Sequence, residues 1–509
     1  MIISEMQIKL AKWSSGNKER KFDRLLRLIA NKEWLRKAAE ITLKSSGSNT
    51  PGIDGISKVE ILDNLTMYID ELHKELIEGV YEPRPAKRVY IPKANGKNRP
   101  LGILCLRDRI VQRAMLMAME PIWESDFHSD SFGFRPKRSV HHAIGNVVIN
   151  LHDTGGNPPR SKGRWVIEGD LSSYFDKVHH KLLMTCIRKR ISDKRLITLL
   201  WKILKAGIIE NNSIHKPQEG VPQGAVLSPL LSNILLNEFD QYMDRKYLCK
   251  KARDKRNGWN ASIRNQTAIA LREKREWQPA ISYTRFADDF VIIVKGSRSQ
   301  AENIREEVKD FLVNLNLTLN MEKTYLTHVN DGFVFLGHRV IRKRGGRGKM
   351  RVVTQIPQEK VRGFSQKITK LLSSNHSINK VEMIRKLNYL VTGWTNFYRC
   401  TTYTAVMFQK LDTIIFWKLG HWLARKYKTR VNKIMRKMYK RDTRYNIKTW
   451  IAHNVNNGKI DREALVKCIG TEKVRKVSGK PRSNPYLEIS YKGITPLIRN
   501  RDIAFISNT

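Results

Sequence analysis

Cysteine is scarce and scattered in this sequence. Its five cysteines, none of which belongs to a Cys-x-x-Cys pair, are Cys105, Cys186, Cys249, Cys400 and Cys468. This spacing excludes a disulfide framework and a zinc ribbon, and it is typical of a reducing, intracellular compartment. Long apolar runs are also missing: no stretch approaches the roughly 18 apolar residues of a membrane span, and the N-terminus lacks a basic-then-apolar leader pattern. We therefore expect a soluble protein with no membrane partner.

Acidic residues are few relative to basic ones. The 509 residues include 48 Asp and Glu against 94 Lys and Arg, a formal net charge of +46. Basic residues occur from Lys18 to Arg501 rather than in one detachable tail. An excess of this size and distribution predicts an extended surface for a polyanion such as nucleic acid, with a solvated charged face as the alternative.

Local patterns outline the first 170 residues. Ser57 and Glu60 have capping-box spacing and Gly79 ends an apolar helical pattern, so residues 58–78 are predicted to be a helix. The other expected elements are a hairpin over 87–104 with an Asn-Gly turn, a helix over 107–124, a surface loop over 153–162 and a buried strand from Trp165 to Gly169.

The second half of the chain divides by composition. Residues 244–277 are basic with few large apolar side chains, which predicts an inserted, RNA-facing segment. The apolar pattern is helical over 361–372, 381–397 and 408–427, with lysines and arginines on the other faces, and this predicts a separate basic helical domain. Periodicity is weak from residue 451 onward, so folding there stays open.

Adjacent acids between two apolar runs are the sharpest feature. Residues 283–294 read as a hairpin with Asp288 and Asp289 at its turn, and a second apolar strand leads into Asp170. Paired aspartates in a turn are often only turn chemistry. An unpaired buried acid is costly, however, and metal ions would satisfy both elements. Two-metal phosphoryl transfer needs such oxygen ligands around two Mg²⁺ about 4 Å apart, with Asp170 and Asp288 as main ligands and Asp289 as the third.

These residues resemble the palm motifs of reverse transcriptases. The motifs, in chain order, are Asp170 with Phe175, the Gly-Pro loop that contains Pro222-Gln223-Gly224, and Phe286-Ala287-Asp288-Asp289. Residues 51–55, 90–102 and 131–136 resemble group II intron reverse transcriptases in particular, and the likeness covers about residues 40–450. Phe286 departs from the family's usual Tyr, which leaves the carboxylates in place.

The resemblance implies a role for several residues near the nucleotide. Lys93 and Arg99 would grip the triphosphate, with a solvated hairpin tip as the alternative. Phe175 would exclude a ribose 2′ hydroxyl, with palm core packing as the alternative. Gln223 would contact nucleotide and template, and Lys323 would donate a proton to pyrophosphate unless it is an ordinary surface lysine.

The resemblance also implies metal and RNA contacts. The backbone carbonyl of Leu171 would join Asp170, Asp288 and Asp289 as a ligand of two Mg²⁺ ions. Four residues would contact RNA or primer, although the aromatic and glycine positions among them also fit core packing: Arg135, Gly337, Trp394 and Arg399. His453, Asn454 and Cys468 lack the ligand pairs of the family's metal-dependent endonuclease, so second-strand cleavage is not expected.

We expect an α+β right-hand polymerase, with fingers and a palm around an antiparallel sheet, followed by an all-α thumb, the maturase domain. The expected divisions are an RNA-binding N-terminal extension (1–80), fingers (81–164), palm (165–350), thumb (351–450) and a short basic tail that could bind DNA but holds no endonuclease (451–509).

The activity that the resemblance implies is RNA-directed DNA polymerisation, with splicing assistance to a group II intron RNA and copying of that intron during its mobility. RNA template, DNA primer or target and deoxynucleoside triphosphates would be its partners, in a ribonucleoprotein at a bacterial nucleoid or in an organelle. Two alternatives stay open: an RNA-binding splicing factor without polymerase activity, and a related reverse transcriptase in host DNA repair or defence. The sequence also leaves open whether the protein forms a homodimer.

Overall fold

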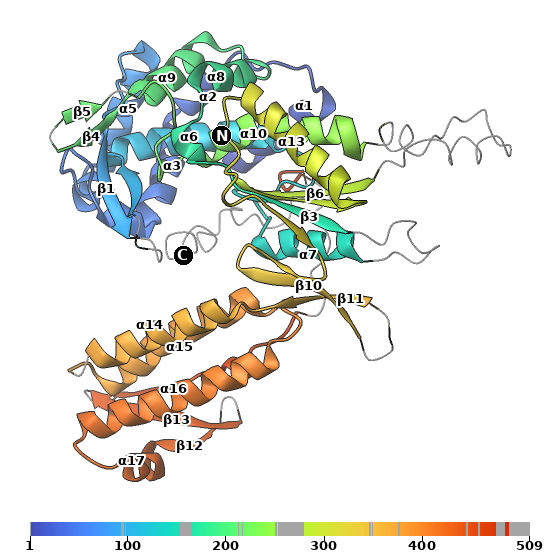
Figure 1. Ribbon diagram of the computed structural model, residues 1–509. Coiled ribbons are helices and arrows are strands. Elements are labelled where there is room, and N and C mark those ends of the chain that lie inside the picture. Colours follow the sequence, from blue (N-terminus) through green and yellow to red (C-terminus); the bar gives the residue numbers. More distant parts are fainter. Residues whose placement is uncertain are drawn as a thin grey trace, which may run out of the picture. The chain divides into compact units, whose positions relative to one another are not determined.

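The computed structural model (Figure 1) describes residues 2–92, 96, 98–152, 164–211, 213–215, 217–249, 252, 279–345, 348, 350–374, 377–443, 446–456, 459–474 and 484–487. The chain forms two compact units. Unit 1 comprises residues 1–146, 158–326 and 479–509, and unit 2 comprises residues 147–157 and 327–478. No helix in the described ranges is both long enough and apolar enough to span a membrane.

The N-terminal part of unit 1 is helical. Its helices are α1 (Ile3–Gly16), α2 (Leu25–Ile29), α3 (Lys32–Lys44), the 3₁₀ turn η1 (Ser46–Asn49), α4 (Lys58–Asp63), α5 (Leu65–Glu78) and α6 (Leu106–Trp123). Helix α3 packs on α6, where the buried indole of Trp34 donates a 2.9 Å hydrogen bond to the Ala114 carbonyl. The predicted capping box at Ser57 and the left-handed Gly79 are confirmed, but the predicted helix is interrupted at Asn64.

A four-stranded sheet in the order β2-β1-β4-β5 follows this helical layer. Its strands are β1 (Ala86–Pro92), β2 (Asn98–Ile103), β4 (Ile208–Glu210) and β5 (Ser213–His215). The predicted hairpin is confirmed, because β1 and β2 pair antiparallel with Ile91 opposite Arg99. Lys93, at its tip, lies outside the described residues, as do the predicted loop at 153–162 and most of the predicted basic insertion.

The second sheet of unit 1 has the order β6-β7-β3-β8. Its strands are β6 (Ala280–Phe286), β7 (Asp289–Lys295), β3 (Trp165–Gly169) and β8 (Tyr325–His328), the last of which ends at the division between the units. Phe239 on α10 (Ser228–Met243) lies edge-on to Phe290 on β7 and stacks with Phe311 on α13 (Arg298–Asn314). These two helices therefore cover one face of the sheet (Figure 1).

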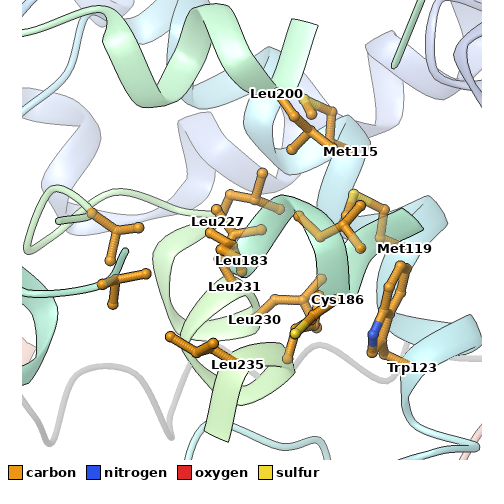
Figure 2. Packing of buried hydrophobic residues seen from close by; sticks show 14 of the residues in the cluster. Met115, Met119, Trp123, Leu183, Cys186, Leu200, Leu227, Leu230, Leu231 and Leu235 are labelled. Atoms are coloured by element: carbon orange, nitrogen blue, oxygen red, sulfur yellow. The ribbon is translucent and has the colours of Figure 1, made fainter. Parts of the chain in front are cut away.

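A large apolar core joins the helices of unit 1. Figure 2 shows residues from α6, α8 (His180–Arg188), α9 (Lys194–Lys205) and α10 packed against one another, including Met115, Leu183, Leu200 and Leu231. Burial of such side chains stabilises by about 1.5–3 kcal/mol each. The remaining unit 1 elements are α7 (Val140–Leu151), which begins in this unit, the 3₁₀ turn η2 (Tyr174–Asp176) and a π-helical turn, η3 (Asp244–Leu248).

Unit 2 begins with a three-stranded antiparallel sheet, β9 (Phe333–Phe335), β10 (His338–Arg344) and β11 (Met350–Gln355). The predicted basic helices follow as α14 (Gln358–Ser374), α15 (Lys380–Tyr398) and α16 (Ala405–Lys426), with α17 (Val431–Met438) after them. They share one buried core.

The region after α17 differs from the predicted all-α domain and extends into the segment whose folding the sequence left open. A second antiparallel sheet, β12 (Tyr439–Asp442), β13 (Ile447–Asn456) and β14 (Lys459–Ala464), packs on α15 and is followed by the 3₁₀ turn η4 (Cys468–Gly470). Trp450 and Ala452 on β13 are fully buried in the helical core. These strands mix charged, polar and apolar residues without a regular alternation, as in Tyr439–Asp442 and Lys459–Ala464, which is why sequence reasoning missed them.

Candidate active site

Strand pairing brings the three predicted carboxylates together. Gly169 at the end of β3 lies opposite Phe290 on the antiparallel strand β7. One residue further along these strands come Asp170 and Asp289, so the pairing places the end of β3 beside the β6–β7 turn that carries Asp288 and Asp289. The residues that sequence reasoning selected therefore meet at one edge of the sheet.

The turn between β6 and β7 is held in an unusual backbone conformation. Ala287 has a positive φ of 57°, which is strained for a residue with a side chain. Gly133 packs directly beneath it, since a Cβ atom on that glycine would lie 2.3 Å from the Ala287 backbone nitrogen. The segment around Gly133 also bonds to β6, where the Phe132 N–H donates to the Arg285 carbonyl over 2.9 Å. The 131–136 segment thus supports the turn.

A buried ion pair lies behind the turn. Both Arg285 and Asp240 are essentially inaccessible to solvent, and the Arg285 Nε donates to Asp240 Oδ1 over 2.7 Å. The same guanidinium donates to Asn233 Oδ1 (3.0 Å) and to the Ala287 carbonyl (2.9 Å). Sequence reasoning missed this cluster. The one clue was a charged residue, Arg285, inside an otherwise apolar strand.

Asp170 already has a cationic neighbour. Lys323 Nζ lies 2.9 Å from Asp170 Oδ2, and Asn320 Nδ2 donates to the same oxygen over 3.2 Å. The Asn320 N–H also donates to the Asp170 carbonyl over 2.9 Å, which ties the two segments together. The Lys323 side chain is 65% exposed, so it is held only by its charged end and can move away.

The electrostatics of the site call for additional positive charge. Partial desolvation by the surrounding protein and the negative charges of Asp288 and Asp170 raise the pKa of Asp289 to about 7, although its side chain is still exposed to solvent at the start of β7. Burial and Asp170 likewise raise the pKa of Asp288, while the charge of Arg99 opposes that rise. Carboxylates crowded in this way are stabilised by a cation between them.

These groups suit Mg²⁺ chemically, because hard carboxylate oxygens are its preferred protein ligands. Within the described ranges, no three His, Cys, Asp or Glu side chains already converge on one point as a ready-made metal cluster. Lys323 and Asn320 both contact one carboxylate oxygen of Asp170, Oδ2. A divalent ion bound at that oxygen would compete with the lysine.

Phe175, Gln223 and Arg99, which are predicted to contact the nucleotide, lie on segments that are bonded to one another. The Val221 N–H donates to the Phe175 carbonyl (2.7 Å), and the Gly102 N–H on β2 donates to the Gln223 carbonyl (2.8 Å). The Gln223 side chain donates to both carboxylate oxygens of Asp176, at 3.1 and 3.3 Å. These bonds join β2, the 220–224 loop and the segment after Asp170. Arg99 on β2 is close enough to affect the pKa of Asp288.

Phe175 is half-buried beside aromatic neighbours. Its ring lies edge-on to Phe134 at 6.2 Å and to Tyr174 at 5.7 Å. Both core packing and a role beside a bound sugar are compatible with this position. Leu171 is buried and forms a backbone bridge to Leu319, which fixes the chain next to Asp170.

The predicted RNA and primer contacts separate into two kinds. Arg135 is buried, and its guanidinium donates hydrogen bonds to the Glu124 carboxylate (3.0 and 2.6 Å) and to two backbone carbonyls. These contacts favour a structural role for Arg135 over direct contact with RNA. Trp394 stacks on Phe364 at 4.7 Å inside the core of unit 2. Gly337 accepts a hydrogen bond from the Tyr398 hydroxyl in the same unit, whereas Arg399 is exposed.

Two protein families match this chain. Residues 91–340 match the family described as "Reverse transcriptase (RNA-dependent DNA polymerase)", and residues 361–442 match "Group II intron, maturase-specific domain". Both matched regions contain the elements that sequence reasoning assigned to a polymerase and to a basic helical domain.

Individual relatives agree with these matches. The chain is 60% identical to Protein YkfC of Escherichia coli over 373 residues, which are 73% of this chain and 97% of that protein. It is 33% identical to the group II intron-encoded protein LtrA of Lactococcus lactis, over 70% of this chain and 65% of LtrA. A putative COX1/OXI3 intron 2 protein of Saccharomyces cerevisiae is 29% identical, over 75% of this chain and 49% of the yeast protein.

Proposed function

Because the chain belongs to the group II intron reverse transcriptases, with a reverse transcriptase domain followed by a maturase-specific domain, we propose that it copies RNA into DNA and assists the splicing of a group II intron RNA. The observation that carries the polymerase part is the placement of Asp170 beside the Asp288–Asp289 turn. The right-hand polymerase fold of the family fits the antiparallel sheet that bears these residues.

Asp170, Asp288, Asp289 and the Leu171 carbonyl would hold two Mg²⁺ ions. When bound, such ions lower the pKa of an attacking hydroxyl and neutralise a leaving pyrophosphate. The protein's own contribution is to fix these oxygen atoms on a rigid sheet. The Gly133 contact and the Arg285 hydrogen bond keep the Asp288 backbone in one position before substrate arrives.

The neighbouring residues would position a deoxynucleoside triphosphate. Arg99, with Lys93 on the same hairpin, would bind the phosphates, and the Phe175 ring would occupy the space of a ribose 2′ hydroxyl. Gln223 sits on the loop bonded to β2 and would contact the base pair. Lys323, once released from Asp170, would be the proton donor to pyrophosphate.

The basic helices of unit 2 would bind the intron RNA, together with the template–primer duplex. Their arginines and lysines are suited to phosphate neutralisation. In a bacterium the resulting ribonucleoprotein would act at the nucleoid, where its DNA target and primer lie. Whether it acts as a homodimer is decided by sedimentation of the purified complex.

Primer extension tests the polymerase. We expect an RNA template, a DNA primer, Mg²⁺ and deoxynucleotides to give extension with the wild type and none with an Asp288→Ala, Asp289→Ala double variant. Asp310→Asn, which changes an exposed acid on α13, is the matched control and should extend normally.

Splicing of the intron RNA, measured in parallel, separates the two roles. The double variant should still promote splicing, since RNA binding does not need the carboxylates. A folded, RNA-binding wild type that gives no extension would contradict the polymerase proposal and favour a protein that acts in splicing alone.

A further inference from the structure

Helix α16 displays two aromatic rings on an exposed face. Trp417 is 47% exposed, and its ring centroid lies 6.1 Å from that of His421, with 32° between the ring planes. Residues four apart lie one turn above each other on a helix. The buried face of α16 is filled by other residues, among them Ile415, Leu419 and Trp422. The core therefore does not explain the outward position of Trp417 and His421.

The ring pair continues into a basic hollow. This shallow, open hollow, with a volume of about 560 Å³, is lined by His421 together with Arg425, Lys428 and Arg430. All three cations are exposed, and the described residues that line the hollow include no Asp or Glu. Two flat rings and three positive charges thus follow one another along the same surface.

The shape of the hollow is fixed by the backbone. Helix α16 ends in a tight turn in which Lys428 has a positive φ of 46° and the Thr429 N–H donates to the Ala424 carbonyl over 3.0 Å. Gly420 allows close packing beneath the turn, because a Cβ atom there would lie 3.0 Å from the Trp450 ring and 3.3 Å from Val431. The backbone beneath the surface is therefore fixed, and binding would have to order only the side chains.

This sequence of groups matches the chemistry of an unpaired nucleotide. A base stacks on exposed aromatic rings, while its flanking phosphates bind arginine and lysine. A continuous RNA duplex offers phosphates but buries the faces of its bases, so it would leave the rings unused. An acidic peptide would likewise engage only the cations.

We propose that Trp417 and His421, together with Arg425, Lys428 and Arg430, form a binding site for an unpaired nucleotide of a structured RNA. The inference rests on the proposed RNA-binding role and adds a specific ligand class to it. The residues concerned belong to unit 2, whereas the catalytic carboxylates belong to unit 1. Substitutions at this site therefore leave the carboxylates of unit 1 unchanged in sequence.

Equilibrium binding of the full chain to three labelled RNAs tests the proposal. The RNAs are a hairpin with an unpaired loop, the same hairpin with abasic loop positions, and a fully paired duplex. We expect Trp417→Ala to weaken binding of the looped RNA by about 5- to 150-fold, the range for loss of one base–aromatic stack. The abasic hairpin and the duplex should bind the variant as they bind the wild type.

Further variants separate stacking from charge and from misfolding. Trp417→Phe should retain most of the wild-type affinity for the looped RNA. Tyr389→Ala, which removes a 74% exposed aromatic ring on α15, should leave that affinity unchanged. In a plot of the logarithm of the binding constant against the logarithm of salt concentration, replacing Arg425, Lys428 and Arg430 by Gln should make the slope less steep. The change should be about 0.7 for each phosphate that these side chains neutralise in the wild type.

Equal affinity of Trp417→Ala and wild type for the looped RNA would overturn the proposal. A second result would also overturn it: Trp417→Ala binds RNA normally but sediments as a monomer where the wild type sediments as a dimer. The exposed face of α16 would then be an interface with a second copy of the chain. Primer extension on a preannealed template is measured alongside. Its absence in the wild type would contradict the polymerase proposal alone, whereas loss of all RNA binding would contradict the RNA-binding role.

Discussion

Asp240→Ala should be among the most damaging substitutions in unit 1, although Asp240 touches no substrate. Its carboxylate accepts hydrogen bonds from Arg285 Nε (2.7 Å), Arg285 Nη2 (2.5 Å) and the Tyr283 hydroxyl (2.8 Å). Burial alone would lower the pKa of Arg285, but the Asp240 carboxylate more than offsets this and raises the pKa. The guanidinium is therefore charged, and the substitution leaves that charge buried without its counterion.

The magnitude follows from this geometry. Breaking a buried ion pair by removing one partner costs about 3–5 kcal/mol. The orphaned Tyr283 hydroxyl adds about 1 kcal/mol or more. Typical domain stabilities are about 5–15 kcal/mol, so the variant should lose a large fraction of the free energy of unfolding of unit 1. Asp240→Asn should lose less, because its amide oxygen can still accept one of the three bonds.

Urea unfolding followed by circular dichroism measures this loss. The matched control is Glu302→Ala, which breaks the exposed ion pair of Arg298 and Glu302 on α13 (3.0 Å) and should cost about 0–1 kcal/mol. Primer extension without urea should also fall in Asp240→Ala, because Arg285 is bonded to the Ala287 carbonyl of the β6–β7 turn, which carries the proposed metal-binding carboxylates. If Asp240→Ala were no less stable than Glu302→Ala, the assignment of this pair as a principal support of the turn would be refuted.

Three further predictions concern the same turn and its neighbours. Gly133→Ala should cut the primer extension rate by about 100-fold, the cost of a displacement near 1 Å, because its Cβ would meet the Ala287 nitrogen at 2.3 Å. Without Mg²⁺, the free energy of unfolding should fall as the pH rises from 3.8 to about 7, because the pKa of Asp289 is higher in the folded than in the unfolded chain. Denaturant titrations over this pH range should show a smaller fall for Asp289→Asn. Lys323→Gln should reach half-maximal extension at lower Mg²⁺ than wild type, because Asp170 loses a competing cation, while its maximal rate should drop.

Local patterns were sufficient to predict much of the site. The Asp288–Asp289 hairpin, the strand before Asp170 and the β1–β2 hairpin each depend on residues close together in the sequence, and the structure contains all three. Their meeting at one sheet edge was inferred from motif order rather than from geometry. The structure supplies the physical reason, which is the antiparallel pairing of β3 with β7.

Long-range partners were beyond sequence reasoning. Asp240 and Arg285 are 45 residues apart, and Asn320 is 150 residues from Asp170. A single sequence shows that a charged residue interrupts an apolar strand but does not show which acid will meet it. The break at Asn64, whose backbone leaves the helical region (φ −122°, ψ 28°), was also not predicted, and α4 and α5 replace one predicted helix.

Acidic residues are few in this chain, and several of them form ion pairs in its interior. Several acids pair with buried arginines, as Glu124 does with Arg135, Asp240 with Arg285 and Asp126 with Arg190. Each pair contributes nothing to the net charge of +46, so that excess resides on other, more exposed cations. This arrangement predicts a steep salt dependence of RNA binding. An arginine that an internal acid binds, such as Arg135 with Glu124, is less available to phosphate than the exposed Arg425 and Arg430.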